Sequence, residues 1–588
     1  MAANSIKDDE EVSQVKKSIT IKRLLGYLFR YKKTIAVVLL IMAYCVGISL
    51  ANPLIIESAI DDYITPGNIK GMIVLVLIAL ALNVIKVLLV KIRMYLMSKM
   101  TNSIIQNIRE EVFTHLQTLG FKFFDSRPTG KILSRVMGDV NSLKQVLQNF
   151  VITLLPDFIT VVAVVIIMLI KNPKLALAGM VGLPLLIVGL LVIENMCRVR
   201  WQIHRKKSSN LNAFLHEDIS GIRIVKTFAA EEEALETFDE LTEEHKNSFI
   251  NAVRVNDAFN SVIEVSTAIS IVCMLYVAIN VMHVDASNVG LLVAFTSYLS
   301  LFWQPIANLG SFYNQIIANL AAAERVFEII DLEPEIKDGE QVGEMPQITG
   351  RVRFEDVGFA YEDGVPVLKD VSFDITPGET IALVGPTGAG KTTIVNLISR
   401  FYDVQTGNIM IDDSNVRDVS IESLRSQLGI MTQDNFLFTG TIRENIRYGK
   451  LDATDEEIEE ACKKVGAHDF IMKLEKGYET ELTERGGGLS AGQKQLLAFA
   501  RTIISDPRIL ILDEATSSID TKSELMVQKG IATILKGRTS FVIAHRLSTI
   551  RNADRIFVIE NGGIAESGKH DELMAKKGLY YNLNMAQA

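Results

Sequence analysis

Six long apolar runs in the first half of the chain limit its fold more than any other feature. Each run is roughly 20 residues long, enough for an α-helix to cross the hydrocarbon core of a bilayer. The runs cover residues 34–53, 71–93, 151–171, 174–195, 257–280 and 287–308. Because six is an even number, the chain leaves the membrane on the side where it entered. We therefore predict an all-α membrane domain of six helices within residues 34–330.

The connections between these runs are very unequal in length. About 60 polar residues separate the second run from the third, and about 60 more separate the fourth from the fifth. Helical arms of about 28 residues would extend roughly 40 Å from the membrane. These long connections carry Arg109, Lys122, Arg127, Lys131, Arg135, Arg198, Arg200, Arg205, Lys206 and Lys207. The short opposite connections carry Glu57, Asp61, Asp62 and Asp285, with Lys171 and Lys174 as exceptions. The positive-inside rule therefore places the long arms in the cytoplasm.

Residues 1–33 form a predicted cytoplasmic N-terminal segment. The first thirty residues are polar and charged, which argues against a cleavable signal peptide. Residues 19–33, ITIKRLLGYLFRYKK, mix leucines and aromatic residues with basic ones, a composition that suits a helix lying in the membrane interface. A simple cytosolic cap is the alternative, and both interpretations keep this end in the cytoplasm.

The second half of the chain has the composition of a soluble protein. Residues 331–350, DLEPEIKDGEQVGEMPQITG, are acidic, contain two prolines and lack helical periodicity, so we predict a linker. Residues 351–588 alternate apolar strands with helical segments, which predicts an α/β domain with a largely parallel sheet. The net charge of −9 argues against nucleic acid as the main partner. Cys45, Cys197, Cys273 and Cys462 lack metal-ligand spacing, and we interpret them as core residues.

The strongest chemical motif is GPTGAGKTT at residues 385–393. It follows the apolar strand IALV, precedes the helix-like IVNLISRF and fits the pattern G-x-x-x-x-G-K-[ST]. In such a loop the glycines let backbone N–H groups wrap the phosphates, while Lys391 reaches the β- and γ-phosphate oxygens and Thr392 ligates Mg²⁺. The predicted nucleotide-binding residues here are Gly385, Pro386, Thr387, Gly388, Ala389, Gly390, Lys391, Thr392 and Thr393.

Two later strands end in residues suited to phosphate chemistry. The strand ILILDEA ends in Asp513 and Glu514. Next to the phosphate loop, Asp513 can hold Mg²⁺ and Glu514 can polarise an attacking water. His545 closes the strand FVIAH, where it can donate to the γ-phosphate, and Gln433 lies in GIMTQDNFLF. Taken alone, the histidine is more often structural and the glutamine is a surface amide.

A second glycine-rich stretch, GGGLSAGQKQ at residues 486–495, precedes the helix-like run LLAFARTII. Backbone N–H groups and the helix dipole make such a helix start an anion site. The chain therefore carries two elements suited to phosphate, about 100 residues apart.

Together these motifs resemble the ATP-binding cassette (ABC) family, and the resemblance covers almost the whole chain. The family's order is kept by FAYED, GPTGAGKTT, the glutamine of MTQDN, LSAGQ, ILILDE, SSID and the histidine of VIAH. The resemblance implies that Tyr361 stacks on adenine and that Gln433 joins Thr392 and Asp513 around Mg²⁺. It implies nucleotide contacts for Ser490, Gly492, Gln493 and Asp520. The catalytic residues that it implies are Glu514, His545, Lys391 and Gln433.

The fusion of six spans to one such domain resembles a half-transporter of the exporter branch. Residues 123–143, FFDSRPTGKILSRVMGDVNSL, and 217–233, EDISGIRIVKTFAAEEE, resemble the cytoplasmic arms of multidrug-type exporters. In that family the arms carry short coupling helices that dock on the nucleotide domains. The resemblance implies a protein of a bacterial inner or plasma membrane, with its nucleotide-binding domain in the cytoplasm and ATP and Mg²⁺ as cofactors.

The second phosphate element implies a partner. In this family LSxGQ caps the ATP held by the other chain's phosphate loop, so two chains form two composite sites and ATP holds them closed. The usual signature is LSGGQ, whereas this chain has Ala491. One extra methyl group can be tolerated in a homodimer. We favour a heterodimer, in which the site that uses Ala491 is the weaker one and this chain keeps intact catalytic residues.

The expected function is ATP-driven export of amphiphilic or hydrophobic, drug-like compounds by alternating access. Asp157 and Glu264 lie within the apolar runs and are candidates for attracting lipophilic cations, whereas Glu194 at a cytoplasmic end is more simply solvated. The alternatives are a lipid or lipid-linked flippase, a peptide exporter, and an ATP-driven regulatory membrane protein that transports nothing.

Overall fold

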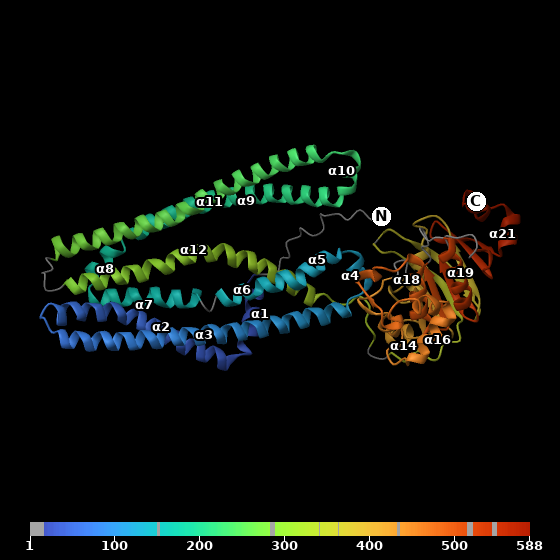
Figure 1. Cartoon of the computed structure of the whole chain (residues 1–588), viewed down its shortest axis with the longest axis horizontal. Helices are drawn as coiled ribbons and strands as arrows, with labels where there is room; N and C mark the ends of the chain where they lie inside the picture. Colours follow the sequence, from blue (N-terminus) through green and yellow to red (C-terminus); the bar gives the residue numbers. More distant parts are fainter. Residues whose placement is uncertain are drawn as a thin grey trace. The chain divides into compact units, whose positions relative to one another are not determined.

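The computed structural model describes residues 17–149, 153–282, 289–339, 342–362, 364–431, 436–513, 521–543 and 550–587. Its contacts divide the chain into two compact units (Figure 1). The helical unit comprises Met1–Gln117 and Pro128–Leu332. The sheet unit comprises Glu333–Ala588 together with Thr118–Arg127, a short segment that lies between two helical parts of the sequence.

α-Helices of 6 to 50 residues build the helical unit. They are α1 (Lys17–Phe29), α2 (Lys32–Ser58), α3 (Ile69–Thr118), α5 (Thr129–Ser134), α6 (Val140–Asn149), α7 (Leu155–Lys171), α8 (Pro173–Gly179), α9 (Gly182–Ser220), α10 (Ile222–Phe228), α11 (Glu231–Tyr276) and α12 (Val289–Asp331). Short π-helical turns at Ala59–Ile64, Arg135–Asp139 and Val277–Val281 extend α2, join α5 to α6 and extend α11.

Within the described residues, five helical stretches are long and apolar enough to cross a membrane. They are Lys32–Ile64, Ile69–Thr118, Pro173–Ser220, Glu231–Val281 and Val289–Ile306. Each overlaps one of the six predicted spans. The remaining predicted span, 151–171, corresponds to α7, a mainly apolar helix of 17 residues, and the first two residues of this span lie outside the described set.

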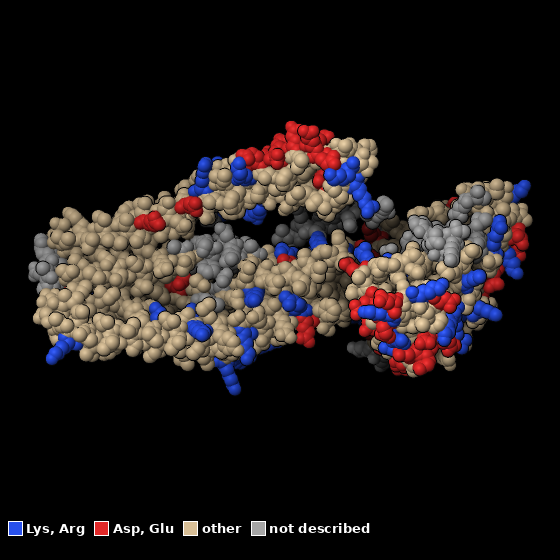
Figure 2. Space-filling model, in the orientation of Figure 1, with Lys and Arg blue, Asp and Glu red and all other residues tan. Residues whose placement is uncertain are grey.

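The predicted helical arms are confirmed, because α3 and α11 continue without a break far beyond their apolar runs. The helices α9 and α11 run side by side as an antiparallel pair joined through α10 (Figure 1). Lys207 of α9 and Glu244 of α11 form an ion pair of 2.6 Å across this pair. The face drawn in Figure 2 shows few charged side chains over the apolar ends of these helices, and many acidic ones near α10. That distribution fits a lipid-facing end and a water-facing end.

Twelve strands are described in the sheet unit. They are β1 (Val352–Phe359), β2 (Leu368–Ile375), β3 (Thr380–Val384), β4 (Thr406–Ile411), β5 (Ser414–Asn415), β6 (Leu428–Met431), β7 (Gly440–Thr441), β8 (Glu481–Leu482), β9 (Ile509–Asp513), β10 (Thr539–Ile543), β11 (Arg555–Glu560) and β12 (Gly563–Gly568). The main sheet has the order β12-β11-β3-β10-β9-β6, parallel except for β12. A second, antiparallel sheet has the order β2-β1-β4-β5.

The sheet unit also contains α-helices. They are α4 (Phe121–Asp125), α13 (Lys391–Ile398), α14 (Ile421–Arg425), α15 (Ile442–Arg447), α16 (Asp455–Val465), α17 (His468–Ile471), α18 (Ala491–Ile503), α19 (Thr521–Leu535), α21 (His570–Lys576) and α22 (Leu579–Gln587). Alternate residues of β3, β9 and β10 enter two separate hydrophobic clusters, one on each face of the sheet. Strands buried on both faces need the nearly continuous apolar sequences that predicted this parallel sheet.

Candidate functional site

The phosphate loop connects β3 to α13 at the carboxyl end of the main sheet. Gly385 has a φ of +148°, and a Cβ atom there would collide with the carbonyl oxygen of Ile559. Gly390, with a φ of +106°, caps the N-terminus of α13 and leaves no room for a side chain beside Leu368. Both positions therefore require glycine. The tight loop that they allow brings backbone N–H groups together at the start of α13, where a phosphate group can bind.

Lys391 begins α13 and is only 8% exposed. Its ammonium donates to the carbonyl oxygens of Gly385 and Pro386 at 2.9 and 2.8 Å. Burial lowers the pKa of Lys391, and the Asp513 carboxylate partly opposes that shift. A buried cation held at the mouth of a glycine loop is well suited to a phosphate group.

Asp513 ends β9, and its charge acts on Lys391. One strand, β10, lies between β9 and β3, the strand that precedes the phosphate loop. The interposed strand pairs with both neighbours in register, so the carboxyl ends of all three lie at one edge of the sheet. Asp513 therefore lies at the same edge of the sheet as the phosphate loop.

Tyr361 follows β1 and is half-buried against two aromatic rings. Its ring meets those of Phe359 and Tyr402 edge-on, with centroids 4.9 and 5.0 Å away. Its hydroxyl shares a hydrogen bond of 3.2 Å with Thr393 in the first turn of α13. The aromatic residue predicted for adenine therefore lies directly beside the helix that follows the phosphate loop.

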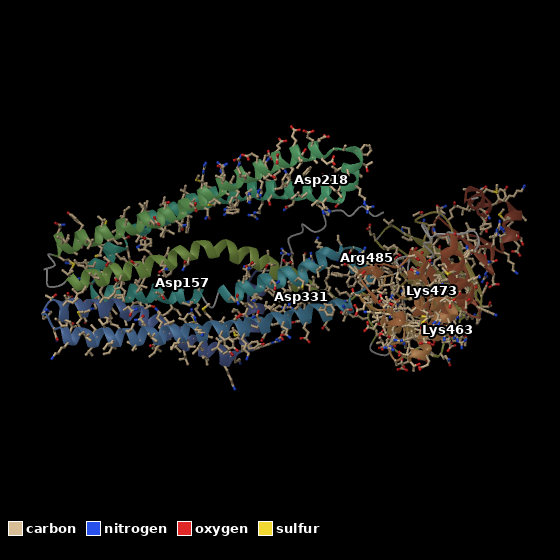
Figure 3. All side chains as sticks on the ribbon, viewed as in Figure 1. Asp157, Asp218, Asp331, Lys463, Lys473 and Arg485 are labelled. Carbon is tan, nitrogen blue, oxygen red and sulfur yellow. The ribbon has the colours of Figure 1, made fainter. Side chains whose placement is uncertain are left out.

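The second glycine-rich stretch ends at α18. Ser490 is the N-cap, and it forms a capping box in which its hydroxyl accepts from the Gln493 N–H and the Gln493 side chain accepts from the Ser490 N–H. Ser490 and Ala491 are exposed, whereas Gly492 is buried. Arg485, labelled in Figure 3, has a φ of +55°, and its carbonyl oxygen accepts from Lys494 at 2.8 Å. The helix start is thus ordered and open to another molecule.

The segment Thr118–Arg127 packs on the sheet unit through α4. The Phe121 and Phe401 rings are 4.1 Å apart, and the Tyr402 hydroxyl donates to the Asp125 carboxylate at 2.7 Å. Lys122 pairs with Glu335 at 3.0 Å. Burial first, and then the bond to Asp125, raise the pKa of Tyr402. A short helix at the end of the first cytoplasmic arm therefore contacts the unit that carries the phosphate loop.

Four of the predicted site residues lie outside the described residues: Gln433, Glu514, Asp520 and His545. Their neighbours Met431, Asp513 and Ile543 end β6, β9 and β10 at the carboxyl edge of the main sheet. Their roles stay predictions from the sequence.

The two intramembrane acids differ in their surroundings. Asp157 lies on α7, facing α12 (Figure 3), and accepts a hydrogen bond of 3.0 Å from the Asn308 amide. Glu264 is exposed on α11. The side chain of Glu194 lies outside the described residues.

Sequence reasoning missed two groups of polar residues. Lys86 lies within the second apolar run, and its ammonium donates to the Ser49 hydroxyl of α2 at 2.7 Å. Its position inside an apolar run was a usable signal. Tyr402 and Asp125 were also missed, because their contact joins residues 277 positions apart and no short motif marks it.

Comparison with known proteins gives matches over nearly the whole chain. The ABC transporter transmembrane region family matches residues 34–306, and the ABC transporter family matches residues 368–517. The ABC transporter ATP-binding protein YknV of Bacillus subtilis (strain 168), described as uncharacterised, is 43% identical over 96% of this chain and 94% of its own. A protein of Staphylococcus aureus (strain NCTC 8325 / PS 47), provisionally named a multidrug export ATP-binding/permease protein, is 39% identical over 96% and 100%.

A solved structure is similar as well. A bacterial Atm1-family ABC exporter with ATP bound has a TM-score of 0.77 and 28% identity, over 95% of this chain and 98% of its own.

Proposed function

The chain belongs to the ABC transporter family, with the fused membrane and ATP-binding domains of an exporter, and we propose that it exports amphiphilic or hydrophobic compounds by alternating access as one half of a dimer. It is a multi-span membrane protein whose ABC domain lies in the cytoplasm, and it couples ATP hydrolysis to transport. The proposal adds the cargo, the partner and the roles of individual residues.

One observation supports the coupling step above the others. The helix α3 runs unbroken from its apolar end to Thr118, and the ten residues Thr118–Arg127 pack as part of the unit that binds ATP. A movement of that unit therefore acts directly on the end of a membrane helix. ATP closes the nucleotide domains, and rigid arms transmit closure to the membrane helices.

The proposed roles at the nucleotide follow from position and charge. The loop 385–393 holds the phosphates, with Lys391 stabilising the transferred charge, and Tyr361 stacks on adenine. The carboxylate of Asp513 and the hydroxyl of Thr392 are oxygen donors of the kind that Mg²⁺ prefers, and Gln433 completes that set. Glu514 polarises the attacking water, and His545 donates to the γ-phosphate.

Glu514→Gln tests the hydrolytic assignment in the purified complex. The amide cannot accept a proton but occupies the same space, so ATP is expected to bind with near-normal affinity and to be hydrolysed at least 100-fold more slowly. Asp513→Asn serves as the comparison, because its expected defect includes a higher Mg²⁺ requirement. Hydrolysis by Glu514→Gln near the wild-type rate excludes this role for Glu514.

A partner half is supported by surfaces that this chain leaves exposed. Ser490 and Ala491 at the start of α18 are exposed, and we propose that this stretch, with Gly492, Gln493 and Asp520, caps ATP held by the partner. The short helix α10 exposes Ile222, Ile224 and Phe228, the last by 77%. Apolar exposure at the tip of a cytoplasmic arm is typical of a docking surface.

We propose a heterodimer because of Ala491. Its methyl group is exposed, so its effect falls on the facing nucleotide rather than on the fold of this chain. Expression of this chain alone tests the proposal. A heterodimeric design predicts monomers or weakly active dimers, with full ATPase activity only after co-expression with the partner half. A stable, fully active dimer of this chain alone favours the homodimer.

We base the proposed cargo on Glu264, an exposed acid that we propose attracts lipophilic cations. Asp157 is a weaker candidate, because its carboxylate already accepts a hydrogen bond from Asn308. Export of a cationic dye should fall several-fold in Glu264→Ala while export of a neutral dye is unchanged. Equal export of the cationic dye by this variant and wild type removes Glu264 from the substrate site. Lipid flipping, peptide export or a regulatory role without transport then becomes the better account.

A further inference from the structure

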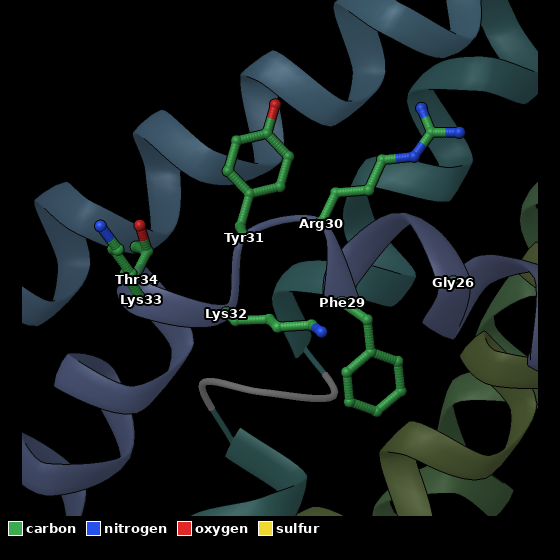
Figure 4. Close-up of a pocket in the computed structure, with 7 residues that line it drawn as sticks. All are labelled: Gly26, Phe29, Arg30, Tyr31, Lys32, Lys33 and Thr34. Atoms are coloured by element: carbon green, nitrogen blue, oxygen red, sulfur yellow. The ribbon is translucent and has the colours of Figure 1, made fainter.

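We propose that the elbow between α1 and α2 is a binding site for anionic phospholipid of the cytoplasmic leaflet. An open pocket of about 700 Å³ lies where the last turn of α1 meets the first turn of α2 (Figure 4). Phe29, Arg30, Lys32 and Lys33 contribute to its lining. Figure 4 shows the Lys32 side chain extending toward the end of α1 that carries Phe29 and Arg30. The pocket lining therefore combines three cationic residues with two aromatic ones, Phe29 and Tyr31.

These cations are not neutralised by the part of the chain that the structure describes. No described carboxylate lies within ion-pair distance of Arg30, Lys32 or Lys33. Arg23, two turns earlier in α1, differs because its guanidinium donates to both oxygens of Asp331 at 2.7 Å. Arg30 lies over the Tyr27 ring, 5.2 Å from its centroid, and among the described residues no carboxylate pairs with its N–H groups, which leaves them available to an oxygen acceptor.

The surroundings favour a lipid over a soluble anion. The apolar run of α2 begins at residue 34, so the pocket lies at the level where headgroups meet acyl chains. Val37 and Leu40 follow Lys33 on the same helix face and are 45% and 71% exposed. Phe29 is 61% exposed at the other wall. A phosphate can rest against the cations while an acyl chain covers these apolar side chains, as for other basic juxtamembrane sites.

The elbow packs against α3 and α12, and a bound lipid would stabilise this packing. Tyr27 of α1 stacks on Phe327 of α12, with centroids 6.3 Å apart, and its hydroxyl donates to Glu111 of α3 at 2.7 Å. The buried face of α1, which includes Leu24 and Leu28, therefore packs on the protein while the basic end faces outward. This division leaves the cations accessible without disturbing the packing of α1.

The experiment uses the full complex in nanodiscs of phosphatidylcholine with 20% phosphatidylglycerol. Native mass spectrometry then counts the phosphatidylglycerol molecules that stay bound. Arg30→Gln/Lys32→Gln/Lys33→Gln is compared with Lys22→Gln/Lys91→Gln/Lys99→Gln, a matched change of three charges at exposed lysines near the same membrane surface. We expect at least tenfold lower retention in the elbow variant and unchanged retention in the control. Equal retention in the two variants overturns the proposal.

Two further measurements on the wild-type complex keep the proposal testable if the elbow variant does not assemble. Hydrogen exchange of residues 26–34 should slow several-fold when phosphatidylglycerol replaces phosphatidylcholine, and no local slowing overturns the site. Inorganic phosphate at 10 mM should not displace the bound lipid. Displacement by phosphate assigns the pocket to a soluble anion and overturns the lipid assignment.

Discussion

Tyr402 contacts both Tyr361 and α4, the short helix at the end of the first cytoplasmic arm. Its ring meets the Tyr361 ring edge-on, and its hydroxyl donates to Asp125 of α4 at 2.7 Å. The tyrosine is 8% exposed, so the rings around it hold it in one position. This side chain therefore links Tyr361 to α4.

Tyr402→Phe is expected to weaken this docking. The ring packing is kept, but the charge-assisted hydrogen bond is lost, at a cost of about 1 kcal/mol because Asp125 is exposed. Stimulation of ATPase activity by transported compounds should fall several-fold, with the KM for ATP near that of wild type. Tyr448→Phe, at an exposed ring, is the control. A double-mutant cycle with Asp125→Ala measures the coupling, and strictly additive effects contradict it.

The residues of the phosphate site could be predicted because a short contiguous pattern specifies them. Lys391 and the glycines of 385–390 are required by the local geometry of a strand, a tight loop and a helix. Asp125 and Tyr402 lie in different parts of the sequence, so only the fold reveals their contact. Lys86 could have been found as an ion within an apolar run, but its partner Ser49 could not.

At the scale of elements, a single carboxylate fixes the path of the linker into β1. Asp412 accepts hydrogen bonds from the backbone N–H groups of Thr349, Gly350 and Arg351 and from the Thr349 hydroxyl, at 2.7 to 3.1 Å. Burial is the largest influence on its pKa and acts upward, but these hydrogen bonds outweigh it and the pKa is lowered overall. The charged form therefore stabilises the folded state.

Asp412→Ala should release residues 349–351. A loss of about 2 kcal/mol corresponds to roughly thirtyfold faster amide exchange through local opening. The pKa of Asp412 in the folded state is below its value near 4 in the unfolded state. Its contribution to stability is therefore complete above about pH 4 and is lost as the pH falls through the folded-state pKa. The difference in the free energy of local opening between wild type and Asp412→Ala should therefore be constant from pH 7 to pH 5. Amide exchange rates corrected for pH measure this difference. Amide exchange in Asp412→Asn, which keeps one acceptor oxygen, should be intermediate between wild type and Asp412→Ala. Equal exchange in all three proteins contradicts the assignment.

The long helices could be predicted from the sequence, but the interruption between α8 and α9 could not. The run 174–195 reads as one span, yet α8 ends at Gly179 and α9 begins at Gly182. The Gly182 N–H donates to the Ser270 hydroxyl of α11 at 3.2 Å, and a side chain at 182 would collide with the Ser266 carbonyl. This close approach of two helices depends on tertiary packing, which hydropathy does not encode.

At the scale of the whole molecule, fold class and exporter organisation could be predicted because they depend on the order of long segments. The position of β10 between β3 and β9 could not, since strand order is set by how crossovers pack and not by strand sequence. The exposed α18 start and the exposed α10 tip are surfaces whose use depends on a second chain.

Vectorial transport is the most direct test of the central claim that ATP hydrolysis drives export through this protein. The complex is reconstituted into proteoliposomes, and ATP is added outside to those molecules whose nucleotide domains face outward. A fluorescent cationic amphiphile should then accumulate inside with ATP, and accumulate neither with a non-hydrolysable analogue nor in Glu514→Gln. Wild-type ATP hydrolysis without net movement of the amphiphile, a labelled lipid or a peptide would contradict export and indicate a regulatory protein.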